Sequence, residues 1–268
     1  MRKSIREAQT RAWAHTLASA LAQSFKTLVL RTLALTRKEL RQYLSAPAFY
    51  GAAVFFLVFS AVWLFYFQGF FALNAATLRP YFSAFPVLYI FIVPVITMKS
   101  WAEERKTGSI ELLLTMPFSE WNLILGKFLS AFTVLLMILA LTIPLPLSLS
   151  LLGTFDIGML LSEYTGAALL GASAIALGLL LSCLSKNQAG SFLGTAAALM
   201  FTMLIVQLTF AFNLPAWLSV TISYLSLAYH FDSFSRGLLD SRNFAFFVLS
   251  TALFLFLNTR VILFRKWK

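Results

Sequence analysis

Charged side chains are scarce in this chain, because Asp, Glu, Lys and Arg together make up only 12% of its 268 residues. A soluble domain of this length needs more charge to cover its surface, so the composition argues against a soluble globular fold. Apolar residues account for 60% of the chain and include 28 phenylalanines. These proportions indicate an integral membrane protein.

Cysteine and histidine are also nearly absent. The single Cys183 excludes an intramolecular disulfide and a cysteine-based metal cluster, and we expect it to be a small packing residue in an apolar run. The two histidines, His15 and His230, fall on opposite sides of the membrane in the topology derived below, so they cannot share a metal ion. No protease, hydrolase or phosphate-binding-loop motif is present. We therefore expect no catalytic residue, no metal site and no cofactor bound by this chain.

Six apolar runs are long enough to cross a hydrocarbon core of ~30 Å. They predict an all-α membrane protein with six transmembrane helices. Prolines at positions 86 and 94 predict a kinked second span, and Pro144 and Pro146 lie in the second half of the third. The predicted spans cover residues 47–68, 82–98, 128–152, 164–184, 190–212 and 244–264.

The distribution of basic residues orients these spans. With a cytoplasmic N-terminus, the inside segments hold 18 of the 21 Lys and Arg residues, and the outside loops hold 3. Such a bias is the positive-inside pattern. A seventh span starting at Leu214 would place the basic C-terminal end outside, so six spans fit better. We expect both termini to be cytoplasmic.

The net charge of +11 arises from basic residues at the ends of spans, where they meet anionic lipid heads, so we do not expect nucleic-acid binding. Residues 1–23 are expected to form a basic cytoplasmic tail, and residues 24–268 the membrane domain. From Leu21 to Leu44, apolar residues recur at helical spacing, with Arg37, Lys38 and Arg41 among the polar positions. This pattern predicts a helix lying in the membrane interface.

Two further patterns concern packing and the outer side. Small residues recur every four or seven positions in the fourth and fifth spans, so we expect close helix packing at Gly171, Gly178, Gly190 and Gly194. The apolar stretch before the last span is short and rich in serine, which predicts re-entrant or interfacial outer helices, with an i,i+4 ion pair. The residues assigned to this outer region are Leu218, Ile222, Leu225, His230, Asp232 and Arg236.

The loop between the second and third spans is the most informative segment. Four successive charged residues, 103–106, precede a break at Gly108. A short apolar helix is predicted from about Ser109 to Pro117, and Ser119 can cap the next helix. Such a broken, amphipathic element is suited to bind another protein, although an ordinary interfacial loop remains an alternative.

Two runs in the sequence resemble a known family. The first comprises Glu104-Arg105-Lys106-Thr107-Gly108-Ser109-Ile110-Glu111-Leu112-Leu113-Leu114, Met116-Pro117 and Gly126-Lys127, and it resembles the signature of ABC-2 type permeases, the membrane subunits of one class of ATP-binding-cassette (ABC) transporter. The second run, Tyr229 to Arg242, is similar to permeases of the gliding-motility and nitrous-oxide-reductase-maturation type.

The resemblance implies a half-transporter in a prokaryotic cytoplasmic (inner) membrane. It would pair with a second copy or a paralogous permease, and it would dock a separate ABC ATPase subunit that carries ATP and Mg²⁺. The cytoplasmic loop would act as the coupling helix. Because the outer loops are short apart from the last, any extracytoplasmic subunit would be a separate chain. The residues that match the signature and become candidates for the ATPase contact are Arg105, Lys106, Thr107, Gly108, Ser109, Glu111, Leu112 and Leu113.

Two other functions compete with an ATP-driven exporter. One is a membrane scaffold or anchor for an extracytoplasmic machine, such as a gliding-motility complex, that moves no solute. The other is an ion-coupled secondary transporter, which usually needs ionisable residues at mid-membrane. Gln207 and Asn258 are the main polar side chains there apart from hydroxyls, and neither is charged.

Overall fold

The computed structural model describes residue 26 and residues 28–70, 77–108, 119–151, 156–211, 215–238 and 240–266. Within these ranges there is no β-strand, and six helices are long and apolar enough to cross a membrane. The predicted all-α class with six transmembrane helices is thereby confirmed. The six run over Pro47–Phe67, Arg79–Lys106, Glu120–Leu149, Ile157–Leu184, Gln188–Val206 and Ser241–Phe264.

Several of these helices are built from shorter pieces. The chain first forms a helix over residues 28–45, here called the N-terminal helix. The labelled elements that follow are α2 (Pro47–Val62), the π-helix η1 (Trp63–Phe67), α3 (Arg79–Phe82), α4 (Phe85–Thr97), α5 (Ala102–Lys106), α7 (Glu120–Thr142), α8 (Pro144–Leu149), α9 (Ile157–Leu184), α10 (Gln188–Ala211), α11 (Ala216–Leu225), α12 (Leu227–Ser235) and α13 (Ser241–Lys266).

Prolines mark where these pieces begin. Pro47 occupies the first turn of α2 behind an extended Ala46, as expected for a residue that lacks an N–H and disfavours a helical predecessor. Pro86 lies in the first turn of α4, and Pro144 opens α8 after a turn. Pro94 lies inside α4, whose last turn still closes by a 2.8 Å bond from the Met98 N–H to the Pro94 carbonyl. The second and third spans are therefore interrupted near prolines.

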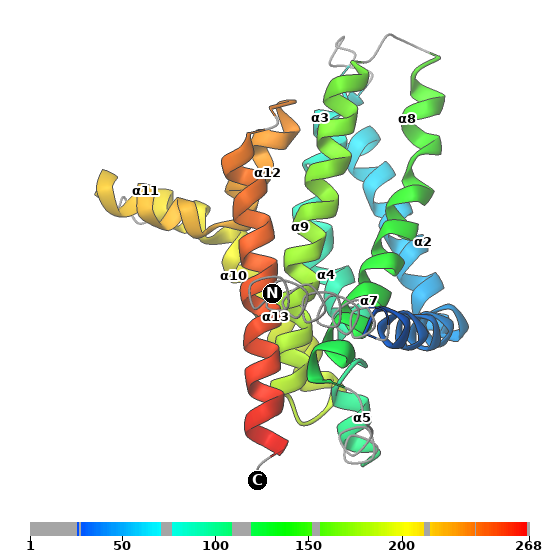
Figure 1. Ribbon diagram of the computed structural model, residues 1–268. Coiled ribbons are helices and arrows are strands. Elements are labelled where there is room, and N and C mark those ends of the chain that lie inside the picture. The colour runs from blue at the N-terminus through cyan, green and yellow to red at the C-terminus, as the bar shows by residue number, and fades with distance from the viewer. Residues whose placement is uncertain are drawn as a thin grey trace, which may run out of the picture.

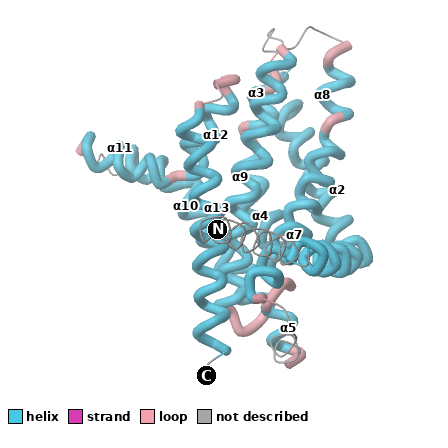
Figure 2. Tube along the Cα trace, viewed as in Figure 1, coloured by secondary structure: helices cyan, strands magenta, loops and turns pink. Residues whose placement is uncertain are grey.

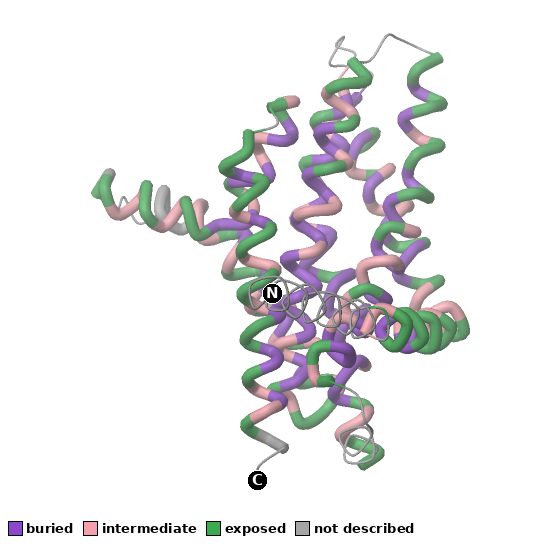
Figure 3. Tube along the Cα trace, viewed as in Figure 1, coloured by how far each residue is buried: buried purple, intermediate pink, exposed green. Residues whose placement is uncertain are grey.

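Helices α4 and α9 form the centre of the bundle. In the spans that contain α4 and α9, 67% and 72% of the most apolar stretch is buried, whereas the corresponding shares in the other four spans are 22–39%. Helix α9 packs against α4, α7, α10, α12 and α13 (Figure 1). Figure 3 shows buried residues gathered along these inner faces and exposed ones along the outside. The outer apolar faces suit lipid contact.

The bundle has two distinct ends. Helix α5 and the C-terminal end of α13 lie at one end, called the basic end below (Figure 1). Helices α3 and α8 lie toward the opposite end. The N-terminal helix lies beside α7, toward the basic end, and α11 projects sideways from the opposite side of the bundle (Figures 1 and 2). The connection from α12 to α13 closes with Gly237 at a φ of 76°, a left-handed conformation that favours glycine.

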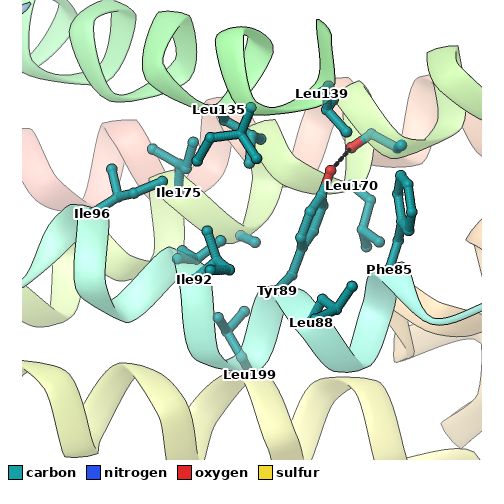
Figure 4. Close-up of a cluster of buried hydrophobic side chains, with 14 of the residues drawn as sticks. Phe85, Leu88, Tyr89, Ile92, Ile96, Leu135, Leu139, Leu170, Ile175 and Leu199 are labelled. Atoms are coloured by element: carbon teal, nitrogen blue, oxygen red, sulfur yellow. Dashed lines mark hydrogen bonds between the residues drawn. The ribbon is translucent and has the colours of Figure 1, made fainter. Parts of the chain in front are cut away.

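The core is densest around α4. Its residues Phe85, Leu88 and Ile92 point into a layer shared with α7, α9 and α10 (Figure 4). The Tyr89 hydroxyl donates a 3.0 Å hydrogen bond to the Ala167 carbonyl of α9, which satisfies a polar atom inside the core (Figure 4).

The predicted packing glycines fall into two groups. A Cβ on Gly171 would lie 2.0 Å from Leu135 Cδ2, and one on Gly178 would lie 2.6 Å from Thr97 Oγ1, so both glycines of α9 allow close approach of neighbouring helices. The structure differs at α10. A Cβ on Gly190 would meet only the side chain of Asn187, and one on Gly194 would meet open space. The α10 glycines therefore do not pack against a helix within the described chain, because their side of α10 faces outward.

Candidate functional site

Three elements bring charged side chains together inside the basic end. Glu39 comes from the buried side of the N-terminal helix, Lys127 from the second turn of α7, and Glu104 from α5. The chain reaches α5 through a turn over residues 98–101 that follows α4. Helix α5 lies at the basic end of the bundle (Figure 1), where its Glu104 reaches Lys127 of α7.

The ammonium group of Lys127 is the centre of this ion cluster. Its Nζ lies 2.7 Å from Glu104 Oε1, 2.8 Å from the Ser100 carbonyl oxygen and 3.4 Å from Glu39 Oε1. The side chains of Lys127, Glu39 and Glu104 are only 1%, 7% and 16% exposed. The ring of Trp101 adds a cation–π contact at 4.8 Å from Nζ. Three acceptors thus match the three N–H donors of the ammonium group.

The ion cluster is sensitive to the loss of any member. Removing charges from water costs several kcal/mol per ion, and the mutual attraction of the ions offsets this cost only while their geometry is kept. Because the three side chains come from three elements, the N-terminal helix, α5 and α7 are held in one arrangement. Displacing one of these elements would leave a charge buried without its partner.

A second contact ties α5 to the end of α9. The Arg105 guanidinium donates to the carbonyls of Cys183, Leu184 and Ser185. The last carbonyls of a helix lack intrahelical partners and carry partial negative charge, so a cation is favourable there. The backbone N–H of Trp101 also donates to Ser182 Oγ, at 3.2 Å. Helix α5 is therefore fixed to α9 as well as to α7.

Of the residues predicted to contact the ATPase, one is half-buried, three are exposed and four lie outside the described residues. Arg105 is half-buried and bonded to α9. Lys106, Thr107 and Gly108 are exposed, and Gly108 has a φ of 71°, which lets the chain leave α5 in a new direction. Four further candidates, Ser109, Glu111, Leu112 and Leu113, lie outside the described residues.

The opposite end carries a looser ion group centred on Asp232. Its carboxylate accepts from Arg236 of the same helix, in the predicted i,i+4 pair, and from Arg79 of α3 at 3.0 Å. Burial alone would raise the Asp232 pKa, but the hydrogen bonds from Arg236 and Arg79 outweigh it and hold the pKa below its usual value. This contact joins α12 to the start of the second span.

The predicted outer helices correspond to α11 and α12. His230 is 4% exposed, with Nδ1 2.6 Å from Asn243 Oδ1 and Nε2 3.0 Å from the Tyr224 carbonyl. It therefore joins α11, α12 and α13. Leu218 and Ile222 are half-buried, but Leu225, expected on the same apolar face, is 65% exposed. Leu225 is the last residue of α11, directly before the buried Ser226 and Leu227.

Lys127 was part of the family signature but was not assigned to the site, and sequence reasoning did not single out Glu39 or Glu163. Glu163 is 1% exposed in α9, and its Oε1 has no hydrogen-bond partner among the described residues. Lys127 and Glu163 lie directly before the predicted third and fourth spans, which begin at residues 128 and 164. The helices begin earlier, at Glu120 and Ile157, so both charged side chains lie inside them. A charged residue directly beside an apolar run was the sequence signal that could have identified Lys127 and Glu163 as buried charges.

Comparison with known proteins identifies the family. Residues 72–260 match the ABC-2 family transporter proteins. The probable multidrug ABC transporter permease YbhR of Escherichia coli K12 is 27% identical over 145 residues, which cover 54% of this chain and 39% of that protein. YbhR of Escherichia coli O157:H7 matches to the same extent. The chain thus spans about two fifths of the length of these curated relatives. With the family match covering most of the described bundle, the chain belongs to the ABC-2 transporter family.

Proposed function

We propose that this protein is the permease subunit of an ABC-2 exporter, coupled through its cytoplasmic loop to a separate ATPase subunit. ATP and Mg²⁺ are bound and ATP is hydrolysed on that subunit. The permease pairs with a second copy or with a paralogous permease to complete a transport path. The basic end of the bundle faces the cytoplasm, in keeping with the distribution of basic residues.

The observation that carries this proposal is the ion cluster at the base of the loop. The loop over residues 107–119 leaves α5 and re-enters the bundle at α7. The 2.7 Å contact between Glu104 and Lys127 joins these two helices across the base of the loop. A displacement of the loop is therefore passed to both helices together, and not absorbed by bending one of them.

The same cluster distributes movement to the rest of the bundle. Arg105 connects α5 to the end of α9, the most buried span, and Glu39 connects the cluster to the N-terminal helix. Buried ions that are paired with one another resist partial displacement, because separating them leaves a charge buried without its partner. An ATPase that moves the loop would thus act on α4, α7 and α9 at once.

The surface of α10 supports pairing of two permeases. Gly190 is exposed, and the Cβ position of Gly194 faces open space. Small residues at four-residue spacing let a second helix approach closely in a membrane. The α10 face is therefore available to a partner permease, whereas the matching face of α9 is already filled by Leu135 and Thr97.

The coupling assignment is tested by capture of the ATPase. A Leu112→Ala, Leu113→Ala double variant should release it, because apolar anchors at the centre of an interface commonly cost ~2 kcal/mol or more when truncated. Lys106→Ala should only weaken capture, as expected of a charge at the rim. The measurement is co-purification of the ATPase in mild detergent, alongside the membrane abundance of the permease.

A matched control is Leu249→Ala, Leu253→Ala, which truncates two exposed leucines of α13 that lie within a span and outside the loop. This control should retain the ATPase. If no ATPase accompanies the unaltered protein, or if the loop variant holds it undiminished, the coupling assignment fails and a scaffold function becomes the better explanation.

A further inference from the structure

The N-terminal helix has a buried side and an outward surface. One side is buried against the bundle: Leu35 packs onto Gly126, where a Cβ would lie 2.6 Å from Leu35 Cδ2. The Tyr43 hydroxyl donates a 3.0 Å hydrogen bond to the Ile96 carbonyl, and Glu39 reaches the ion cluster. This buried side fixes how the helix is rotated, and with it the residues that face outward.

The outward surface combines apolar and basic residues. Leu30 and Leu33 are 57% and 54% exposed. Arg37 lies one turn beyond Leu33 and Arg41 one turn beyond Arg37, so the two exposed arginines continue the same outer stripe. Lys38 is also exposed and lies farther round the helix. Guanidinium groups thus sit directly beside apolar surface.

The exposed charge on this helix is of one sign. Residues 26–45 contain five basic residues, Lys26, Arg31, Arg37, Lys38 and Arg41, and a single acidic residue, Glu39. Glu39 is 5% exposed and paired with Lys127, so it does not offset the surface charge. The outward surface therefore attracts anions.

The position of the helix places these arginines at the depth of lipid headgroups. It lies beside the end of α4 and the first half of α7, as its contacts with Ile96 and Gly126 show (Figure 1). One residue, Ala46, separates it from the first transmembrane helix. A helix at the boundary of a span lies where phosphate groups meet acyl chains.

We propose that Arg37 and Arg41 bind the phosphate of an anionic phospholipid in the leaflet at the basic end. The planar, multi-donor guanidinium suits bidentate phosphate contacts, and a juxtamembrane basic cluster attracts anionic lipid. The acyl chains cover Leu30 and Leu33, which an acidic protein surface would leave without an apolar partner. Because Glu39 lies on the same helix, the bound lipid also holds it in the ion cluster.

The site does not depend on the proposed transport function, so it is tested on the permease alone. The purified protein in an uncharged detergent is titrated with fluorescent phosphatidylglycerol and, separately, with fluorescent phosphatidylcholine. The unaltered protein should prefer phosphatidylglycerol. An Arg37→Gln, Arg41→Gln variant should bind phosphatidylglycerol roughly thirtyfold more weakly, as expected from the loss of two surface cations.

The control is Lys186→Gln, Arg260→Gln, which removes two exposed cations that lie outside the N-terminal helix. It should keep at least half of the affinity for phosphatidylglycerol. An Arg37→Lys, Arg41→Lys variant preserves charge and should bind with intermediate affinity, which provides a readout if the glutamine variant does not fold.

Three results would overturn the proposal. Equal binding of the two lipids by the unaltered protein would show that no anionic site exists. An equal loss in the control would show that binding reflects net charge. A glutamine variant that keeps its affinity for phosphatidylglycerol but loses a co-purifying protein would assign the basic stripe to that protein instead.

Discussion

The two ends of the bundle carry ion groups of three residues each, with the signs of the charges reversed. At the basic end, one cation, Lys127, lies between two carboxylates. At the opposite end, one carboxylate, Asp232, lies between two arginines. The Lys127 side chain is 1% exposed, whereas Asp232 is 45% exposed. Burial, and not the number of pairs, therefore decides how strongly each group holds its elements together.

This difference matches what each end joins. The buried cluster fixes helices that flank the loop, and water cannot replace its lost contacts. The Asp232 group joins α12 to α3 in contact with water, which can solvate either partner when the pair separates. The basic end is thus built as a stiff joint, and the opposite end as a contact that opens at little cost.

The strongest test of this contrast is Lys127→Ala. It leaves the Glu39 and Glu104 carboxylates buried without their cation and should lower the free energy of unfolding by about 3–5 kcal/mol. Thermal unfolding of the detergent-solubilised protein measures the loss. A compensating variant, Lys127→Met with Glu39→Gln and Glu104→Gln, removes all three charges and should recover most of the stability. An unchanged melting temperature in Lys127→Ala would show that the cluster is solvated.

An intermediate effect is expected at Arg105, which is half-buried. Arg105→Gln removes charged hydrogen bonds to the end of α9 and should cost about 1.5–3 kcal/mol. Its neighbour Lys106 is exposed, so Lys106→Gln should leave the melting temperature unchanged. Comparing the two melting temperatures separates an internal role from a surface role. Equal small shifts would mean that the Arg105 contact contributes nothing measurable.

The sequence predicted the fold well because apolar periodicity and length decide which segments cross a membrane. The predicted helix start after Ser119 also agrees with α7, although the Ser119 side chain makes no capping hydrogen bond. The breaks near Pro86 and Pro144 follow from the missing proline N–H. These features depend on neighbouring residues in the chain, so they can be read locally.

The site was harder to predict, because its contacts join distant positions. Glu39 and Lys127 are separated by 88 residues, and no spacing rule relates them. Burial also changed the meaning of single residues: Arg105 matched a surface motif, yet it bonds to the end of α9. Likewise, the same small-residue spacing surrounds Gly171, which is packed, and Gly194, which is open, because spacing does not say which side of a helix faces the bundle.

The smallest expected effect belongs to the Asp232 group and depends on pH. The pKa of Asp232 is lowered in the folded protein, because the hydrogen bonds from Arg236 and Arg79 outweigh the opposing effect of burial. The pair therefore contributes stability above the unfolded pKa of about 3.9, and this contribution is lost as the pH falls through the lower folded value. With both arginines about half exposed, the contribution at neutral pH should be about 0–1 kcal/mol. Arg79→Gln should cost no more than this at pH 7 and nothing at a pH below both pKa values, as measured by thermal unfolding at each pH.

Asp232→Asn serves as the control, because it should lose the same pH dependence. If Arg79→Gln destabilised the protein as much as Lys127→Ala does, the distinction between a stiff and an easily opened end would not stand.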